Sequence, residues 1–186
     1  MTLERRFSFL GDRNSLRSLS DGCWAPIEEW LGESLPGEYK DLVAGYGDGV
    51  IAGHLYIPHP SGSRGLLHFM QEERKAFQES YEPLKRWINP RALEVWETVV
   101  PWAYHDWNGD TCFLLPPAPE RGEEVWNVGI AFRQCPDLEI FDGGVENFLE
   151  MVIKKGEYPR GWPRGRPVWM PVDDPRLTEP PEGERR

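Results

Sequence analysis

The residues best placed to do chemistry are three carboxylates beside two tryptophans in the middle of the chain. Asp106, Asp110 and Glu124 lie close in sequence to Trp107 and Trp126. Paired carboxylates beside an aromatic ring are typical of enzymes that cleave glycosidic bonds. A β-turn collects Asp and Asn for another reason, because their short side chains hydrogen-bond to the local backbone. The sequence therefore leaves a carboxylate-pair hydrolase open but favours a plain hairpin turn.

Metal-binding patterns fail on spacing. His54 and His59 lack the close pairing with further nitrogen or sulfur ligands that zinc requires. Asp106–Asp110 imitates the start of a calcium loop. In that comparison Thr111 takes the place of the required glycine, and Pro117 takes the place of the bidentate glutamate. We therefore expect no metal site.

Patterns for nucleophiles and phosphates fail as well. Gly45–Gly49 is rich in glycine but precedes an expected strand, whereas a phosphate-binding loop follows a strand and opens a helix. No Gly-x-Ser-x-Gly motif occurs, and Cys23, Cys112 and Cys135 show no CxxC spacing. The sequence predicts free thiols and no nucleophilic catalytic residue, and we expect no cofactor.

The net charge of the chain limits the classes of partner that it is expected to bind. The chain of 186 residues has 21 Lys and Arg against 31 Asp and Glu, a net charge of −10. Residues 21–156 hold 11 basic and 23 acidic residues, a net charge of −12. Because Lys and Arg contact phosphates, this balance argues against direct binding of nucleic acid or of anionic membranes. It is first of all typical of a well-solvated surface, and it also suits a basic protein partner.

The spacing of apolar residues predicts the helices and strands that position these residues. Apolar residues recur with helical spacing, and β-branched or aromatic runs between turn residues predict strands. Pro83 should end the third helix near Tyr81, and Asn108-Gly109 predicts a tight hairpin. Helices are expected at 25–31, 35–47, 66–88 and 142–156, and strands at 50–57, 99–105, 111–115, 125–132 and 138–141. Several strands in series predict an α+β class with a mostly antiparallel sheet.

The ends of the chain differ from its middle. Residues 1–20 lack periodicity and are expected to be an N-terminal arm, with no apolar segment typical of a secretion signal. Residues 157–186 contain seven prolines and are expected to be an extended tail. Whether Trp162 and Trp169 hold that tail against the domain stays open. No apolar run approaches the roughly 18 residues of a membrane span, and we expect a cytoplasmic protein.

Four motifs occur in a fixed order along the chain: Leu31-Gly32 with Leu35-Pro36-Gly37-Glu38-Tyr39-Lys40, then Tyr46-Gly47-Asp48-Gly49-Val50, then Pro101-Trp102-Ala103 with Asp106, Asn108, Gly109 and Asp110, and last Trp126-Asn127-Val128 with Phe148-Leu149. In this order they resemble the SUKH superfamily, which comprises bacterial immunity proteins and a eukaryotic branch that regulates cell-wall assembly. The similarity covers 25–156, within an expected domain at 21–156, whereas 59–96 is longer than the family pattern and the proline-rich tail has no counterpart.

The resemblance implies a single domain with a sheet of about six strands flanked by helices, and a non-enzymatic role. Bacterial members bind and neutralise a protein toxin, often a nuclease. An acidic surface would suit a nuclease that is basic where it meets phosphate. The expected contact residues are Asp106, Trp107, Asp110, Glu123 and Glu124, four acids and a tryptophan around the hairpin. Two alternatives stay open: a scaffold or regulatory protein on the same fold, and the carboxylate-pair hydrolase.

Overall fold

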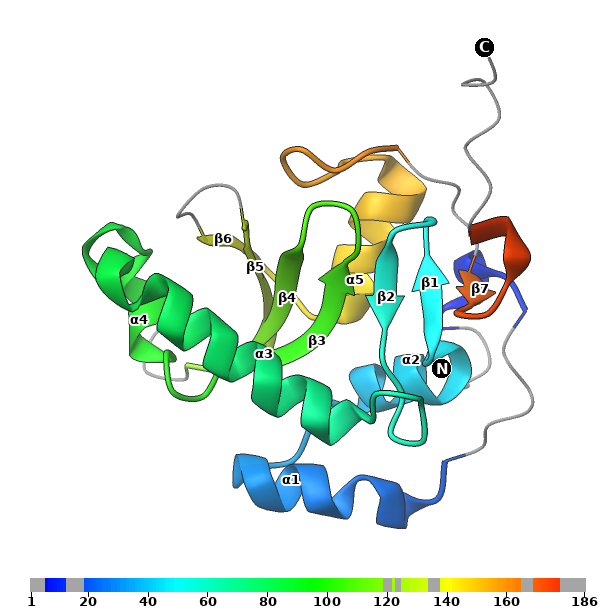
Figure 1. Ribbon diagram of the computed structural model, residues 1–186, viewed down its shortest axis with the longest axis horizontal. Helices are drawn as coiled ribbons and strands as arrows, with labels where there is room; N and C mark the ends of the chain where they lie inside the picture. Colours follow the sequence, from blue (N-terminus) through cyan, green and yellow to red (C-terminus); the bar gives the residue numbers. More distant parts are fainter. Residues whose placement is uncertain are drawn as a thin grey trace.

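The computed structural model describes residues 6–12, 19–118, 122, 125–133, 138–164 and 169–177. They form an α+β structure around one antiparallel sheet in the order β6-β5-β4-β3-β2-β1-β7 (Figure 1), which confirms the expected class. The strands are β1 (Gly49–Ile51), β2 (Leu55–Ile57), β3 (Val100–His105), β4 (Asp110–Leu115), β5 (Asn127–Ala131), β6 (Leu138–Phe141) and β7 (Trp169–Pro171).

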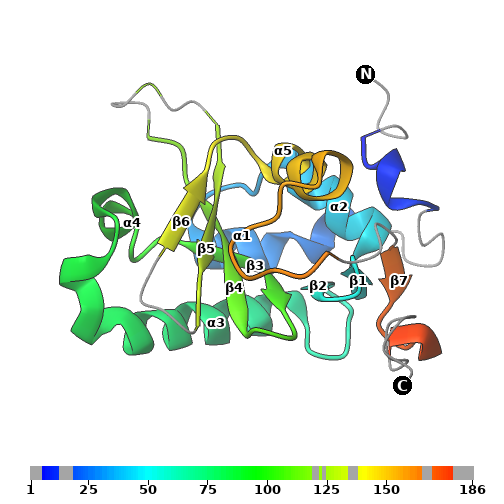
Figure 2. The ribbon, with the colours of Figure 1, turned by 90° about the horizontal axis from the view of Figure 1, so that it is seen from above.

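Helices cover both faces of the sheet. The α-helices are α1 (Ala25–Leu31), α2 (Gly37–Tyr46), α3 (Leu66–Tyr81), α4 (Pro90–Glu94) and α5 (Val145–Leu149). Short helical turns are η2 (Ser8–Leu10), η3 (Asp21–Cys23), η4 (Glu82–Trp87) and η7 (Pro175–Leu177), and the π-helical η6 (Glu150–Lys155) continues α5. Figure 2 shows α3 on one side of the sheet and α2 and α5 on the other.

The face under α2 and α5 carries the larger apolar core. Tyr39, on the apolar stripe expected for α2, is fully buried and meets Trp102 of β3 edge to face at 6.3 Å. Phe148 of α5 packs on the same indole at 6.1 Å. Burying such large rings supplies several kcal/mol of hydrophobic stabilisation, on the order of 1.5–3 kcal/mol for each side chain. The helical segment formed by α5 and η6 ends where expected, at Gly156, which has the left-handed conformation.

The opposite face carries a smaller core under the second half of α3. Phe77 contacts Phe113 of β4 at 4.6 Å and Trp96 at 4.8 Å. The Tyr81 hydroxyl donates a hydrogen bond to the Phe132 carbonyl at 2.6 Å. The α-helix ends at Tyr81, as Pro83 predicted, and the chain continues as η4. This packing fixes one face of α3 above the ends of β3, β4 and β5.

One expected strand is wrong in the structure, because residues 50–57 form a hairpin instead of a single strand. β1 and β2 pair with Val50 opposite Tyr56, and the chain turns at Ala52-Gly53. Both turn residues have positive φ, 56° at Ala52 and 77° at Gly53. Such a turn matches the strand twist, but alanine is an uncommon residue in it. The sequence therefore lacked the usual Asn-Gly signal.

Part of the proline-rich segment lies against the domain. β7 pairs antiparallel with β1, and Met170 lies opposite Val50. The Trp169 indole Nε1 donates a 2.6 Å hydrogen bond to the Tyr46 carbonyl. The indole passes so close to Gly49 that a Cβ there would lie 2.1 Å from Nε1. Glycine is therefore required at this strand position, and β7 becomes the seventh strand of the sheet.

Candidate functional site

The β3–β4 turn, residues 106–109, is the centre of the candidate site. The Gly109 amide donates to the His105 carbonyl at 2.8 Å, and the Asn108 amide donates to His105 Nδ1 at 3.1 Å. A further hydrogen bond, from the Asp106 amide to the His54 carbonyl at 2.9 Å, ties this turn to the β1–β2 turn. The expected Asn-Gly hairpin is thus present and braced by a neighbour.

Asp110 is buried, so the expectation that it is an exposed acid is wrong. Its side chain is 2% exposed at the start of β4. One carboxylate oxygen accepts from the Arg133 amide at 3.0 Å. The other accepts from Trp162 Nε1 at 3.0 Å and from Asn108 Nδ2 at 3.5 Å. Because its partners lie 23 and 52 residues further along the chain, the local sequence gave no sign of this role.

Two buried histidines lie beneath the turn. The His54 and His105 rings are 4.5 Å apart, and Trp162 contacts the His105 ring at 4.7 Å. Burial lowers the pKa of each imidazole to about 4, helped at His54 by the neighbouring His105 and opposed by an interaction with the Ala52 carbonyl. Both rings are therefore neutral at pH 7. Their rings pack beneath the turn, and His105 Nδ1 supports it by accepting the hydrogen bond from the Asn108 amide.

Trp107 projects from this support into solvent. Its side chain is 60% exposed, and its ring lies 5.9 Å from that of His54. Asp106 beside it is also exposed. Glu123 and Glu124, the remaining expected contact residues, lie outside the described part of the chain. The structure thus brings Asp106 and Trp107 together at the surface.

The carboxylates do not form the pair that a hydrolase needs within the described residues. Asp106 faces solvent, whereas the Asp110 carboxylate is occupied by three donors. Neither residue lines the cavity next to the turn. General acid–base chemistry on a sugar needs two carboxyl groups facing one substrate. Glu124, the third of the expected carboxylates, lies outside the described residues.

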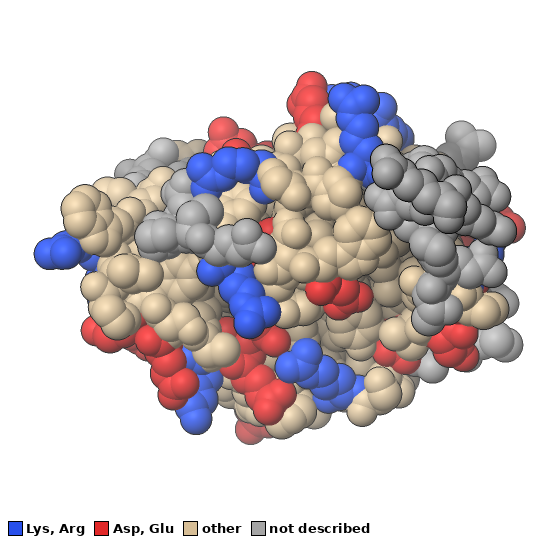
Figure 3. Space-filling view, turned by 45° about the horizontal axis from the view of Figure 1, so that its top comes forward, with Lys and Arg blue, Asp and Glu red and all other residues tan. Residues whose placement is uncertain are grey.

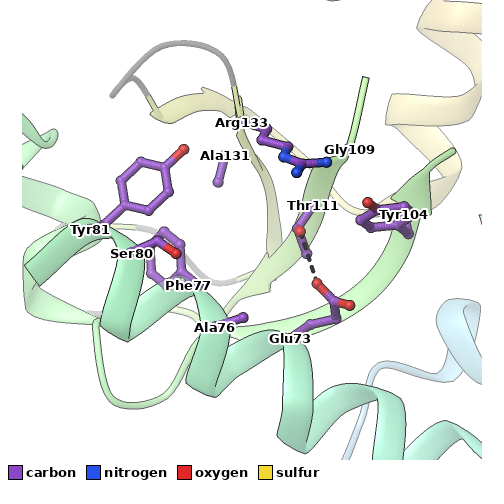
Figure 4. A pocket seen from close by; sticks show the side chains of 10 residues that line it. All are labelled: Glu73, Ala76, Phe77, Ser80, Tyr81, Tyr104, Gly109, Thr111, Ala131 and Arg133. Atoms are coloured by element: carbon purple, nitrogen blue, oxygen red, sulfur yellow. Dashed lines mark hydrogen bonds between the residues drawn. The ribbon is translucent and has the colours of Figure 1, made fainter. Parts of the chain in front are cut away.

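A cavity lies beside the turn, and no pattern in the sequence predicted it. It has a volume of about 270 Å³ and lies between α3 and the ends of β3, β4 and β5 (Figure 4). Its lining comes from distant segments, and only the spacing of the α3 residues was visible in the sequence. The lining residues are Glu73, Ala76, Phe77, Ser80, Tyr81, Tyr104, Gly109, Thr111, Ala131 and Arg133.

Charges are mixed on the face shown in Figure 3, where acidic and basic side chains lie side by side. In the described part of the chain several charged side chains form ion pairs, as Arg64 does with Glu72 at 3.4 Å and with Glu73 at 3.2 Å. Such exposed pairs contribute little to stability. Any electrostatic attraction at this face comes from local acidic groups together with the net charge of the molecule.

The function of this protein is inferred from its fold and its site, because comparisons with known proteins identify no match. No family model, curated protein or solved structure matches the chain. In the described part of the chain, no helix has the length and apolar character to cross a membrane. Among the same residues, no three His, Cys, Asp or Glu side chains are grouped to hold a metal ion.

Proposed function

We propose that the protein is a non-enzymatic immunity-type protein that binds and neutralises a basic protein toxin, such as a nuclease, in the cytoplasm. The SUKH resemblance implies this role. The observation that carries it is the exposed indole of Trp107, held beside Asp106 on a braced turn. Large aromatic side chains ringed by polar groups dominate the binding energy of protein interfaces.

The turn is preorganised for contact. The Asp106 amide is bonded to the His54 carbonyl, and Asn108 Nδ2 donates to the Gly161 carbonyl at 3.1 Å. Segments from two other parts of the chain therefore hold the turn in place. A rigid contact surface loses less conformational entropy on binding than a mobile loop does. This favours recognition over a role as a plain connection.

Electrostatics supports a basic partner. Residues 21–156 carry a net charge of −12, and a nuclease is basic where it meets phosphate. Opposite net charges speed the encounter of two proteins, and salt weakens the effect. Asp106 would meet that partner directly, because it is exposed next to Trp107.

The test is titration calorimetry with the product of the neighbouring gene at two salt concentrations. We expect one-to-one binding that weakens with salt, and Trp107→Ala should weaken it by roughly 30-fold or more, as for an interface hot spot. The matched control is Trp87→Ala, because Trp87 is 63% exposed on η4, away from the turn, and should leave the affinity unchanged.

Two outcomes would contradict the proposal. Equal effects of the two tryptophan variants would remove the turn from the interface. Absence of binding to the neighbouring product would instead favour a scaffold or regulatory protein on the same fold.

A further inference from the structure

We propose that the cavity beside α3 binds a small planar carboxylate, with Arg133 as its counter-ion. This cavity, called the α3 cavity below, is lined by the residues labelled in Figure 4. The inference concerns a second site and does not rest on toxin binding by Trp107. Its basis is the shape of the cavity and the polar groups around it.

The cavity has aromatic side chains at opposite ends and room for one ring. Phe77 and Tyr104 approach it from α3 and β3, and the short side chains of Ala76 and Ala131 leave space between helix and sheet (Figure 4). A volume of about 270 Å³ lies just below the roughly 300 Å³ at which the usual range of ligand pockets begins. A single aromatic ring with a short substituent matches these dimensions.

Donor groups converge at the mouth of the cavity. The Arg133 side chain crosses Gly109 so closely that a Cβ there would lie 2.6 Å from Arg133 Cδ and 2.9 Å from a guanidinium nitrogen. The same position lies 3.2 Å from the Tyr104 hydroxyl. Gly109 also has a φ of 74°, so it is required twice over. The Arg133 guanidinium and the Tyr104 hydroxyl therefore both lie close to the backbone at Gly109.

These donors have no acceptor in the described part of the chain. No side-chain hydrogen bond or ion pair there engages the Arg133 guanidinium, the Tyr104 hydroxyl or the Ser80 hydroxyl. The one carboxylate in the lining is already occupied: Glu73 accepts from the Thr111 hydroxyl at 3.2 Å and from Arg64 at 3.2 Å. The cavity therefore offers free donors and selects a ligand rich in acceptors.

A carboxylate suits these donors better than a neutral group does. The planar guanidinium fork of Arg133 matches the two oxygens of a carboxylate, and such charge-assisted bonds are about twice as strong as neutral ones. The ring attached to that carboxylate would lie in the space between Phe77 and Tyr104. Recognition of an aromatic carboxylate thus uses both the charge at the mouth and the apolar lining of the α3 cavity.

The test is an NMR titration of the ¹⁵N-labelled full chain with phenylacetate, with phenylacetamide as the uncharged match. We expect phenylacetate to shift the Gly109 and Thr111 amides in a saturable way, and phenylacetamide to bind at least tenfold more weakly. Arg133→Gln should weaken phenylacetate binding at least tenfold. Arg86→Gln is the control, because Arg86 is an exposed arginine lying over Trp87.

A second variant keeps the test independent of Arg133. Ala76 is exposed on α3, so Ala76→Leu should fold while filling the α3 cavity, and it should abolish the shifts. Equal binding of phenylacetate and phenylacetamide, equal losses in the two arginine variants, or no saturable shift would each overturn the proposal. Trp107→Ala should leave phenylacetate binding intact, which separates this site from the proposed toxin interface.

Discussion

Removal of the Asp110 carboxylate should strongly destabilise the protein, because one buried and one partly buried donor would lose their acceptor. The Arg133 amide and Trp162 Nε1 each lie 3.0 Å from a carboxylate oxygen. A hydrogen bond to a charged group contributes about 1.5–3 kcal/mol. The longer contact with Asn108 Nδ2, at 3.5 Å, adds little. Allowing for water that enters the vacated space, Asp110→Ala should lower the free energy of unfolding by about 3–5 kcal/mol.

Asp110→Asn separates charge from shape. The amide keeps one acceptor oxygen but turns an NH₂ group toward a second donor. We expect a loss of about 2 kcal/mol, between wild type and Asp110→Ala. Because small domains are stable by only about 5–15 kcal/mol, both losses are large enough to measure.

Urea unfolding followed by circular dichroism measures these differences. Asp106→Ala is the matched control, since that carboxylate is exposed four residues earlier, and it should change the free energy of unfolding by less than about 0.5 kcal/mol. A loss below about 1 kcal/mol for Asp110→Ala would refute the reasoning. In that case the hydrogen bonds from Trp162 Nε1 and the Arg133 amide to this carboxylate would contribute little to the free energy of unfolding.

Two further predictions concern buried polar groups. The Tyr39 hydroxyl is buried without a hydrogen-bond partner among the described residues, so Tyr39→Phe should leave stability unchanged or raise it by up to about 1 kcal/mol in urea unfolding; a loss above about 1 kcal/mol would contradict this. Burial and the neighbouring His105 hold the pKa of His54 near 4, so as pH falls from 7 to 5 the unfolded chain gains a proton that the folded state does not. The wild-type protein should therefore lose about 2 kcal/mol more than His54→Leu over this interval in urea unfolding, and equal losses in the two proteins would contradict this.

The helices and most strands could be predicted from the sequence because their signals are local. The α2 stripe of Tyr39, Leu42, Val43 and Tyr46 is buried as its spacing indicates, and Asn108-Gly109 marks the β3–β4 turn. The β1–β2 hairpin escaped prediction because its turn uses Ala52 at positive φ, where local propensity argues against a turn.

The site was less predictable because its parts meet only after folding. Asp106 and Trp107 could be placed on a turn, but nothing local showed that Asp110 would face inward. Its burial depends on Trp162, which arrives from the proline-rich segment. The α3 cavity has the same origin, since Arg133 reaches it from the end of β5. Contacts between distant segments decide which polar residues remain free for ligands.

The position of β7 has a consequence during synthesis of the chain. The outer edge of β1 is complete at Ile51, but its partner begins only at Trp169. At translation rates of about 5–20 residues per second, that edge waits roughly 6–24 s for its native strand. Over this interval its unpaired amides and carbonyls can template other extended segments. β7 is the last strand of the sheet to be synthesised, so the speed of translation sets the shortest time for which this edge of β1 lacks its native partner.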